Sequence, residues 1–199
     1  MQNARAITRS FASSRLLLCL VALPGLAFAH PGPHHAVDSW SGFLHPLTGI
    51  DHLLAMLAVG LWSVQLGRKA MWVLPAVFPV AMLLGAVLGM ANVGLPLIEP
   101  MIAASVIVMG AAVACGLRLP VTASAVLISF FAIFHGYAHV AEMPVNSTMA
   151  SYTAGFVAAT VLLNFLGVRA GLWLAHTSQA VTRMSGTFIA LTGAVLLVV

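Results

Sequence analysis

Residues 45–60, HPLTGIDHLLAMLAVG, place His45, Asp51 and His52 at the head of a segment that is otherwise apolar. Ionisable side chains are costly inside a bilayer, so they usually face the interior of a helix bundle or a water-filled cavity and mark a functional site. The stretch therefore indicates a membrane-spanning helix with a polar site at one end.

The composition of the whole chain supports a membrane protein. Of its 199 residues, 61% are hydrophobic and 6% are charged, and the mean hydropathy is +1.07. Several apolar runs approach the roughly 20 residues that a helix needs to cross a bilayer, whereas the alternating segments of about 10 residues found in outer-membrane barrels are missing. We expect an all-α integral membrane protein built as a helix bundle.

Residues 1–29 have the three parts of a cleavable signal peptide: a basic start, the apolar run LLLCLVAL and the small-residue motif Ala27-Phe28-Ala29. Cleavage is expected before His30, and an uncleaved first transmembrane helix is the alternative. The signal would remove three of the eight basic residues and leave five against four acidic ones. The sequence pI of 9.8 therefore implies no nucleic-acid partner.

Hydropathy, with Gly, Pro and charges as boundaries, predicts six spans inside a transmembrane domain over 46–199. The spans are 46–66, 70–90, 98–117, 121–140, 149–168 and 180–199. The amphipathic stretch 169–183 either lies in the membrane interface or extends the neighbouring helices. Before the domain comes a His-rich exported segment, 30–45.

The orientation follows from two independent features. A cleaved signal exports the new N-terminus, and basic residues should then gather in the cytoplasmic loops. In an arrangement with both ends exported, the mature basic residues all fall inside: Arg68, Lys69, Arg118, Arg169 and Arg183. We expect a multi-pass protein of a bacterial inner membrane, with the N-terminus and the C-terminus outside.

The segment FHGYAHVAE, residues 134–142, forms a candidate ligand stripe in the fourth span. His135 and His139 are four residues apart and Glu142 follows three later, so all three lie on one helix face. Two imidazoles and a carboxylate can bind one divalent cation. A pair of interfacial histidines that make only hydrogen bonds is the alternative.

In the first span, His45 precedes Pro46, a residue that suits the first helical turn, so His45 is expected at or just before the helix start. His52 lies about 10 Å further along the axis. The two histidines are either successive steps of an entry path or, if Gly49 permits a bend, ligands of one ion. Asp51 is a third ligand or the carboxylate that orients an imidazole.

Other polar groups fall on the same expected side. His30, His34, His35 and Asp38 form a polar tail that either captures metal or is a linker, and Glu99 supplies an oxygen ligand or caps a helix. Cys115 is the single cysteine left after the signal, so a cysteine metal site cannot form within one chain. The scattered methionines are interpreted as core filler.

Here the motifs become specific: HPLTGIDHLLAMLAVGLW and FHGYAHVAE resemble the two signatures of the HupE/UreJ family of nickel and cobalt permeases. The signal, the six spans and the length are also similar, so the resemblance covers essentially the whole chain. Val140 departs from it, since the family commonly has Gly there. The resemblance implies that the metal-handling residues are His45, Asp51, His52, His135, His139 and Glu142.

The resemblance also implies a secondary permease that imports a divalent metal ion, nickel and also cobalt, from periplasm to cytoplasm without a prosthetic group. No Walker A loop or other nucleotide-driven motor is encoded in the sequence. A metal-dependent membrane enzyme and a non-transporting metal receptor or assembly partner are the rival functions. The expected partners are the metal ion and the lipid bilayer, with a homo-oligomer or metalloenzyme maturation machinery left open.

Overall fold

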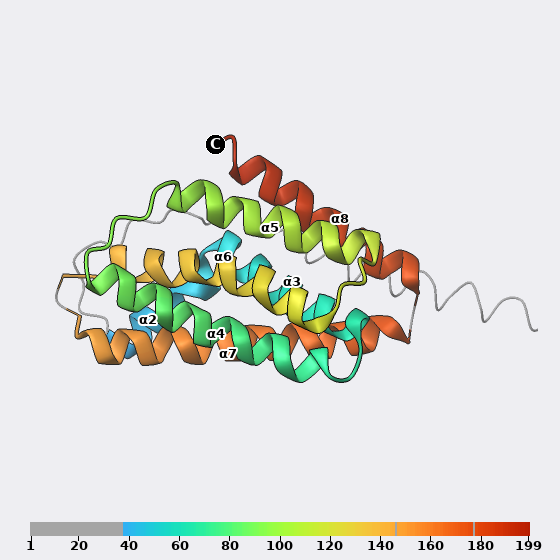
Figure 1. Cartoon of the computed structure of the whole chain (residues 1–199), viewed down its shortest axis with the longest axis horizontal. Helices are drawn as coiled ribbons and strands as arrows, with labels where there is room; N and C mark the ends of the chain where they lie inside the picture. The colour runs from blue at the N-terminus through green and yellow to red at the C-terminus, as the bar shows by residue number, and fades with distance from the viewer. Residues whose placement is uncertain (1–37, 146, 177) are drawn as a thin grey trace, which may run out of the picture. The chain divides into compact units, whose positions relative to one another are not determined.

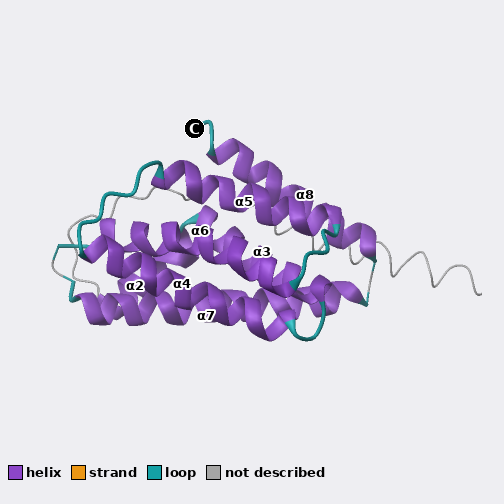
Figure 2. Cartoon of the chain, in the orientation of Figure 1, coloured by secondary structure: helices purple, strands orange, loops and turns teal. Residues whose placement is uncertain are grey.

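The computed structural model describes residues 38–199 except Asn146 and Thr177, and within them the chain forms helices and loops without a strand (Figures 1 and 2). The expected signal 1–29 and the tail histidines His30, His34 and His35 lie outside the described residues. The helices are α2 (Asp38–Thr48), α3 (Ile50–Leu66), α4 (Ala70–Met90), α5 (Ile98–Cys115), α6 (Val121–Ala141), α7 (Met149–Ala175) and α8 (Gln179–Leu196).

Four of these helices, α4, α5, α6 and α7, are long and apolar enough to cross a membrane. The pair α2 and α3 passes the same criteria together, although it is bent by 79° at the break between the two helices. The all-helical, multi-pass character predicted from hydropathy is therefore confirmed. The count of six spans and their orientation stay predictions.

The start of the first span differs from the sequence-based expectation. Pro46 lies inside α2, and His45 lies in the last turn of that helix, whereas we expected both at the start of one helix. The helix is interrupted instead at Gly49, whose extended backbone (φ −76°, ψ 111°) separates α2 from α3. Residues 38–45, expected within an exported segment, are thus helical and precede a sharp bend.

The amphipathic stretch 169–183 extends the neighbouring helices, which was one of the two alternatives. Helix α7 continues to Ala175, and α8 begins at Gln179 after only a short connection. Ser178 caps α8, because its hydroxyl accepts a hydrogen bond of 3.1 Å from the backbone N–H of Ala180. A serine in this position satisfies one of the free N–H groups at a helix start.

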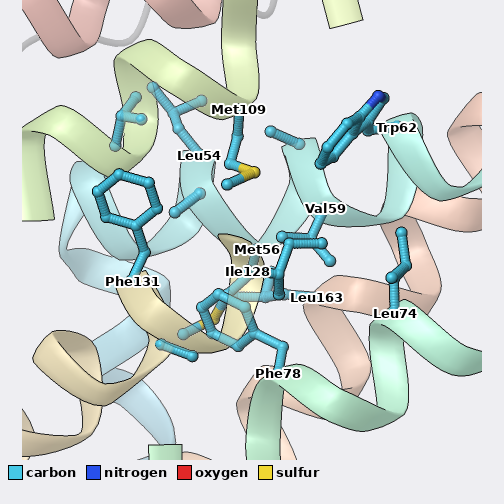
Figure 3. Packing of buried hydrophobic residues seen from close by; sticks show 14 of the residues in the cluster. Leu54, Met56, Val59, Trp62, Leu74, Phe78, Met109, Ile128, Phe131 and Leu163 are labelled. Atoms are coloured by element: carbon cyan, nitrogen blue, oxygen red, sulfur yellow. The ribbon is translucent and has the colours of Figure 1, made fainter. Parts of the chain in front are cut away.

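Helix α3 is the centre of the described bundle, since it contacts every other helix. Figure 3 shows its Leu54, Met56, Val59 and Trp62 among side chains from α4, α5, α6 and α7. In Figure 1, α5 and α8 lie side by side along the upper edge, and α4 packs along α6. These packings position the N-terminal end of α3 beside the C-terminal end of α6.

Glycines set how closely the helices approach. A Cβ added at Gly85 or Gly136 would overlap the backbone of the facing helix, so α4 and α6 touch along their main chains. The same holds for Gly60 and Gly167 between α3 and α7. Small residues that let backbones meet are common in membrane helix interfaces, where dispersion contacts drive association. The first contact holds α6 against α4, and the second holds α7 against the central helix α3.

Candidate metal centre

Three histidines from three helices meet at one end of the bundle. The bend at Gly49 turns α2 back so that His45 faces His52, and α6 supplies His139. The ring centroids of His139 lie 4.9 Å from His45 and 4.7 Å from His52, and one potential ligand atom from each of the three lies within 4.8 Å of the others. The convergence that we left open in the sequence is therefore realised, and we call these three residues the histidine cluster.

The spacing of the three rings is one that could hold a single ion. Metal–imidazole bonds are about 2.0–2.1 Å long, so opposed ligand atoms lie up to about 4.2 Å apart around a metal. Nitrogens within 4.8 Å of one another reach that separation through small side-chain rotations. Both ring nitrogens of His139 are buried without a hydrogen-bond partner among the described residues, so either can act as the ligand.

Solvent exposure decreases from one side of the cluster to the other. The side chains of Glu142 and His45 are 42% and 27% exposed, and His45 Nε2 lies 2.9 Å from the Glu142 Oε2. His52 and His139 are buried behind them. A carboxylate and a partly exposed imidazole therefore form the solvent-exposed side of the histidine cluster.

Asp51 orients His52. Its Oδ1 accepts hydrogen bonds from His52 Nδ1 at 2.8 Å and from the His52 backbone N–H at 2.6 Å. Because the proton of the imidazole then resides on Nδ1, Nε2 keeps a free lone pair, and that atom has no partner among the described residues. A carboxylate behind a histidine is the usual support of a metal-binding imidazole. This is the orienting role that the sequence left open for Asp51.

His135 lies deeper than the cluster and has a different partner. Its ring centroid is 4.7 Å from that of His52, and the residue is fully buried. Ser105 on α5 donates its hydroxyl proton to the Ile102 carbonyl at 2.6 Å and therefore accepts from His135 Nε2 at 2.8 Å. The structure thus groups His135 with Ser105, leaving its Nδ1 as the free lone pair.

Several residues around the site were not anticipated. Phe156 of α7 stacks flat on His139, with ring centroids 4.5 Å apart, and Tyr152 lies 6.4 Å from His45. Ser105 is the third. In the sequence, Tyr152 and Phe156 are aromatic residues at helical spacing in an apolar run, a pattern that mostly means core, so they carried no separate signal.

Glu99 lies outside the histidine cluster, and only the backbone position of Asp38 is described. Glu99 is exposed in the first turn of α5, and Asp38 is the first residue of α2. Val140, the departure from the family pattern, faces Gly89 of α4, where a Cβ on the glycine would lie 3.1 Å from the valine Cβ. The larger side chain on α6 is therefore accommodated by a glycine on the helix opposite.

Comparison with known proteins gives one consistent result. The sequence model of the HupE/UreJ protein family matches residues 17–196. Protein HupE of Rhizobium leguminosarum bv. viciae is 43% identical over 182 residues, which cover 91% of this chain and 95% of that protein. No solved structure matches the chain. The likeness includes all the described helices and both histidine-bearing segments.

Proposed function

Because the chain belongs to the HupE/UreJ family, we propose that it is a secondary permease that imports a divalent transition metal ion, with nickel as first choice and cobalt as second. The observation that supports the proposal most directly is the histidine cluster between α2, α3 and α6, with ligand atoms within 4.8 Å of one another. Imidazole suits borderline divalent ions such as Ni(II) and Co(II), and the family likeness selects these two among them.

The proposed entry begins at the exposed side of the site. Glu142 and His45 replace water molecules of the hydrated ion, and the buried His52 and His139 then complete its coordination. Asp51 stabilises the cation through its negative charge and through the His52 ring that it orients. His135, one step deeper, receives the ion next through Nδ1.

Inward movement needs a driving force. A membrane potential that is negative inside favours entry by about 2.3 kcal/mol per charge per 100 mV, and a divalent ion carries two charges. In the proposed arrangement the α2–α3 pair and α4 to α8 make six crossings of the inner membrane, and the cluster faces the periplasm. The exposed basic residues at the other end of the helices support this orientation.

The test is uptake of radiolabelled nickel and cobalt by proteoliposomes that contain the purified protein. Wild type should accumulate metal, and His52→Ala, His139→Ala and Glu142→Ala should each lower the initial rate by on the order of tenfold or more. His176→Ala also replaces a histidine, but at the exposed C-terminal end of α7 and outside the histidine cluster. It should transport like wild type.

Two results would overturn the proposal. Wild-type protein that binds metal and hydrolyses a substrate, with no accumulation, would indicate the membrane enzyme. Wild-type protein that binds metal tightly and neither transports nor reacts would indicate the receptor or assembly partner.

A further inference from the structure

Deep in α7 lies a polar side chain that neither the motifs nor the histidine cluster includes. We propose that Asn164, with Thr160 one turn before it, forms an inner station for the transported ion, which passes from the histidine cluster to the Asn164 side-chain oxygen on its way through the bundle. The inference rests on the proposed transport function and names the next ligand after the cluster.

The first support is the state of the Asn164 amide. The residue is 1% exposed, and neither its Oδ1 nor its Nδ2 has a hydrogen-bond partner among the described residues. Buried polar groups in proteins are nearly always hydrogen-bonded, and asparagine in membrane helices usually bonds to a neighbouring helix. An amide that holds no helix in place calls for another role, and its oxygen is a neutral ligand for a cation.

The second support is the position of Asn164 on α7. Phe156, Thr160 and Asn164 follow one another at four-residue spacing, so they share a face and descend in steps of about 6 Å. Phe156 stacks on His139 of the cluster. Thr160 Oγ1 lies 2.7 Å from the Phe156 carbonyl oxygen and 3.6 Å from Met82 Sδ of α4. The stripe therefore runs from the cluster into the bundle.

The third support lies beyond Asn164. The chain has a cavity of about 310 Å³ near the opposite end of α3, lined in part by Val64 and Gln65 of α3 and by Gly171 of α7. Gly171 comes seven residues after Asn164, or about 10 Å along the helix. The Gln65 Oε1 in this lining is buried and also has no hydrogen-bond partner among the described residues. Along α7, Asn164 therefore lies between Phe156, which stacks on the cluster, and Gly171, which lines the cavity.

The ligand chemistry fits a passage. Imidazoles and carboxylates bind Ni(II) and Co(II) well, whereas single amide, hydroxyl and thioether groups bind them more weakly. Conduction requires sites that are favourable enough to enter and weak enough to leave. The change from the imidazoles of the cluster to the amide oxygen of Asn164 on α7 provides that decrease. The close contact of Gly60 with the backbone at Asn164 keeps the bundle closed at this depth in the described state.

Uptake and binding should separate in variants of Asn164. Asn164→Leu keeps the number and branching of the side-chain heavy atoms but removes the ligand, and should lower the initial rate of nickel uptake on the order of tenfold while the purified protein still binds nickel at the cluster. Asn164→Gln should retain more uptake than Asn164→Leu, since it keeps an amide oxygen as a weak ligand. Leu163→Met, a conservative change at the neighbouring buried residue, should leave uptake at the wild-type rate.

The outcomes distinguish the inference from the function beneath it. A wild type that accumulates no metal contradicts the permease itself. If wild type transports metal and Asn164→Leu transports it at the same rate, only the inner station is contradicted. Retained nickel binding by Asn164→Leu shows that the variant is folded.

A spectroscopic measurement tests the same point without transport. In a background with Cys19→Ala and Cys115→Ser, Asn164→Cys loaded with excess Co(II) should show the charge-transfer absorption of a cobalt–thiolate bond. Phe165→Cys, whose position is 56% exposed on the outside of the same helix, should not. Absence of the band from Asn164→Cys, or equal bands in both proteins, would overturn the proposal.

Discussion

At the scale of single residues, hydrogen bonds determine which ring nitrogen of His52 and of His135 keeps a free lone pair. Asp51 holds the proton of His52 on Nδ1, and Ser105 holds that of His135 on Nε2. The two imidazoles therefore present lone pairs from opposite nitrogens, although both rings pack edge to face with one another. In the proposed transport path, such fixed tautomers would spare the ion a proton rearrangement at His52 and at His135.

Replacing Asp51 tests whether fixing the tautomer of His52 contributes to metal binding. Asp51→Asn keeps the size of the side chain but loses the charge and lets the His52 ring adopt either tautomer. Nickel affinity should fall about 10-fold to 100-fold, as for other supporting carboxylates of metal-bound histidines. Titration calorimetry on the purified protein measures the change. An unchanged dissociation constant would remove Asp51 from the site.

Asn164→Leu should change stability and uptake in opposite directions. A buried polar group without a partner costs about 1–3 kcal/mol, so Asn164→Leu should raise the free energy of unfolding by part of that amount. Thermal melting in detergent should show a higher midpoint for Asn164→Leu than for wild type, with Leu163→Met close to wild type. A lower midpoint for Asn164→Leu would mean that the amide has a stabilising partner.

At the scale of elements, the bend between α2 and α3 builds the cluster. His45 and His52 are seven residues apart, and in one straight helix they would lie about 10 Å apart along the axis. The 79° turn at Gly49 brings their ring centroids to 5.6 Å. The site thus depends on a helix break as much as on its ligands.

Gly49→Ala should weaken metal binding through this break. A Cβ at Gly49 would lie 3.0 Å from Asp51 Oδ1, so this carboxylate, which orients His52, must give by a few tenths of an ångström. Alanine also favours helix over the extended backbone by up to about 1 kcal/mol. We expect nickel affinity to fall on the order of tenfold, which corresponds to about 1.4 kcal/mol.

Gly94 offers a matched control for this change. A Cβ on Gly94, in the loop between α4 and α5, meets nothing within 4 Å. Gly94→Ala should therefore bind nickel like wild type in the same calorimetric titration. Equal affinity in Gly49→Ala and Gly94→Ala would show that the bend tolerates a side chain and does not require glycine.

Hydropathy was sufficient for most of the helices and insufficient for the site. The run 70–90 is bounded by charges and a polar loop, and α4 has those bounds. The sequence permitted a bend at Gly49 but did not determine it, because the bend angle depends on packing against α7. His135 and His139 share one helix face, yet the partner on α5 separates their roles. Asn164 is a single amide in an apolar run, and the mean hydropathy of that run does not reveal it.

At the scale of the whole molecule, charge divides along the helices. Glu142 and Asp51 lie at the end that carries the cluster, whereas Arg118 and Arg183 line the cavity near the other end of α3. All five arginines and lysines of the described residues are exposed. A bundle with its basic end in the cytoplasm would take cations from the acidic end, in the direction of the membrane potential.

Labelling of single cysteines tests this orientation. In a background with Cys19→Ala and Cys115→Ser, Gly94→Cys lies in the loop at the expected periplasmic side, and Lys69→Cys lies at the expected cytoplasmic side; both positions are exposed. A membrane-impermeant maleimide added to spheroplasts should label Gly94→Cys at once and Lys69→Cys only after permeabilisation. The reverse pattern would place the histidine cluster in the cytoplasm, where it would serve metal release or export, because a site that captures ions for import must face the compartment from which they come.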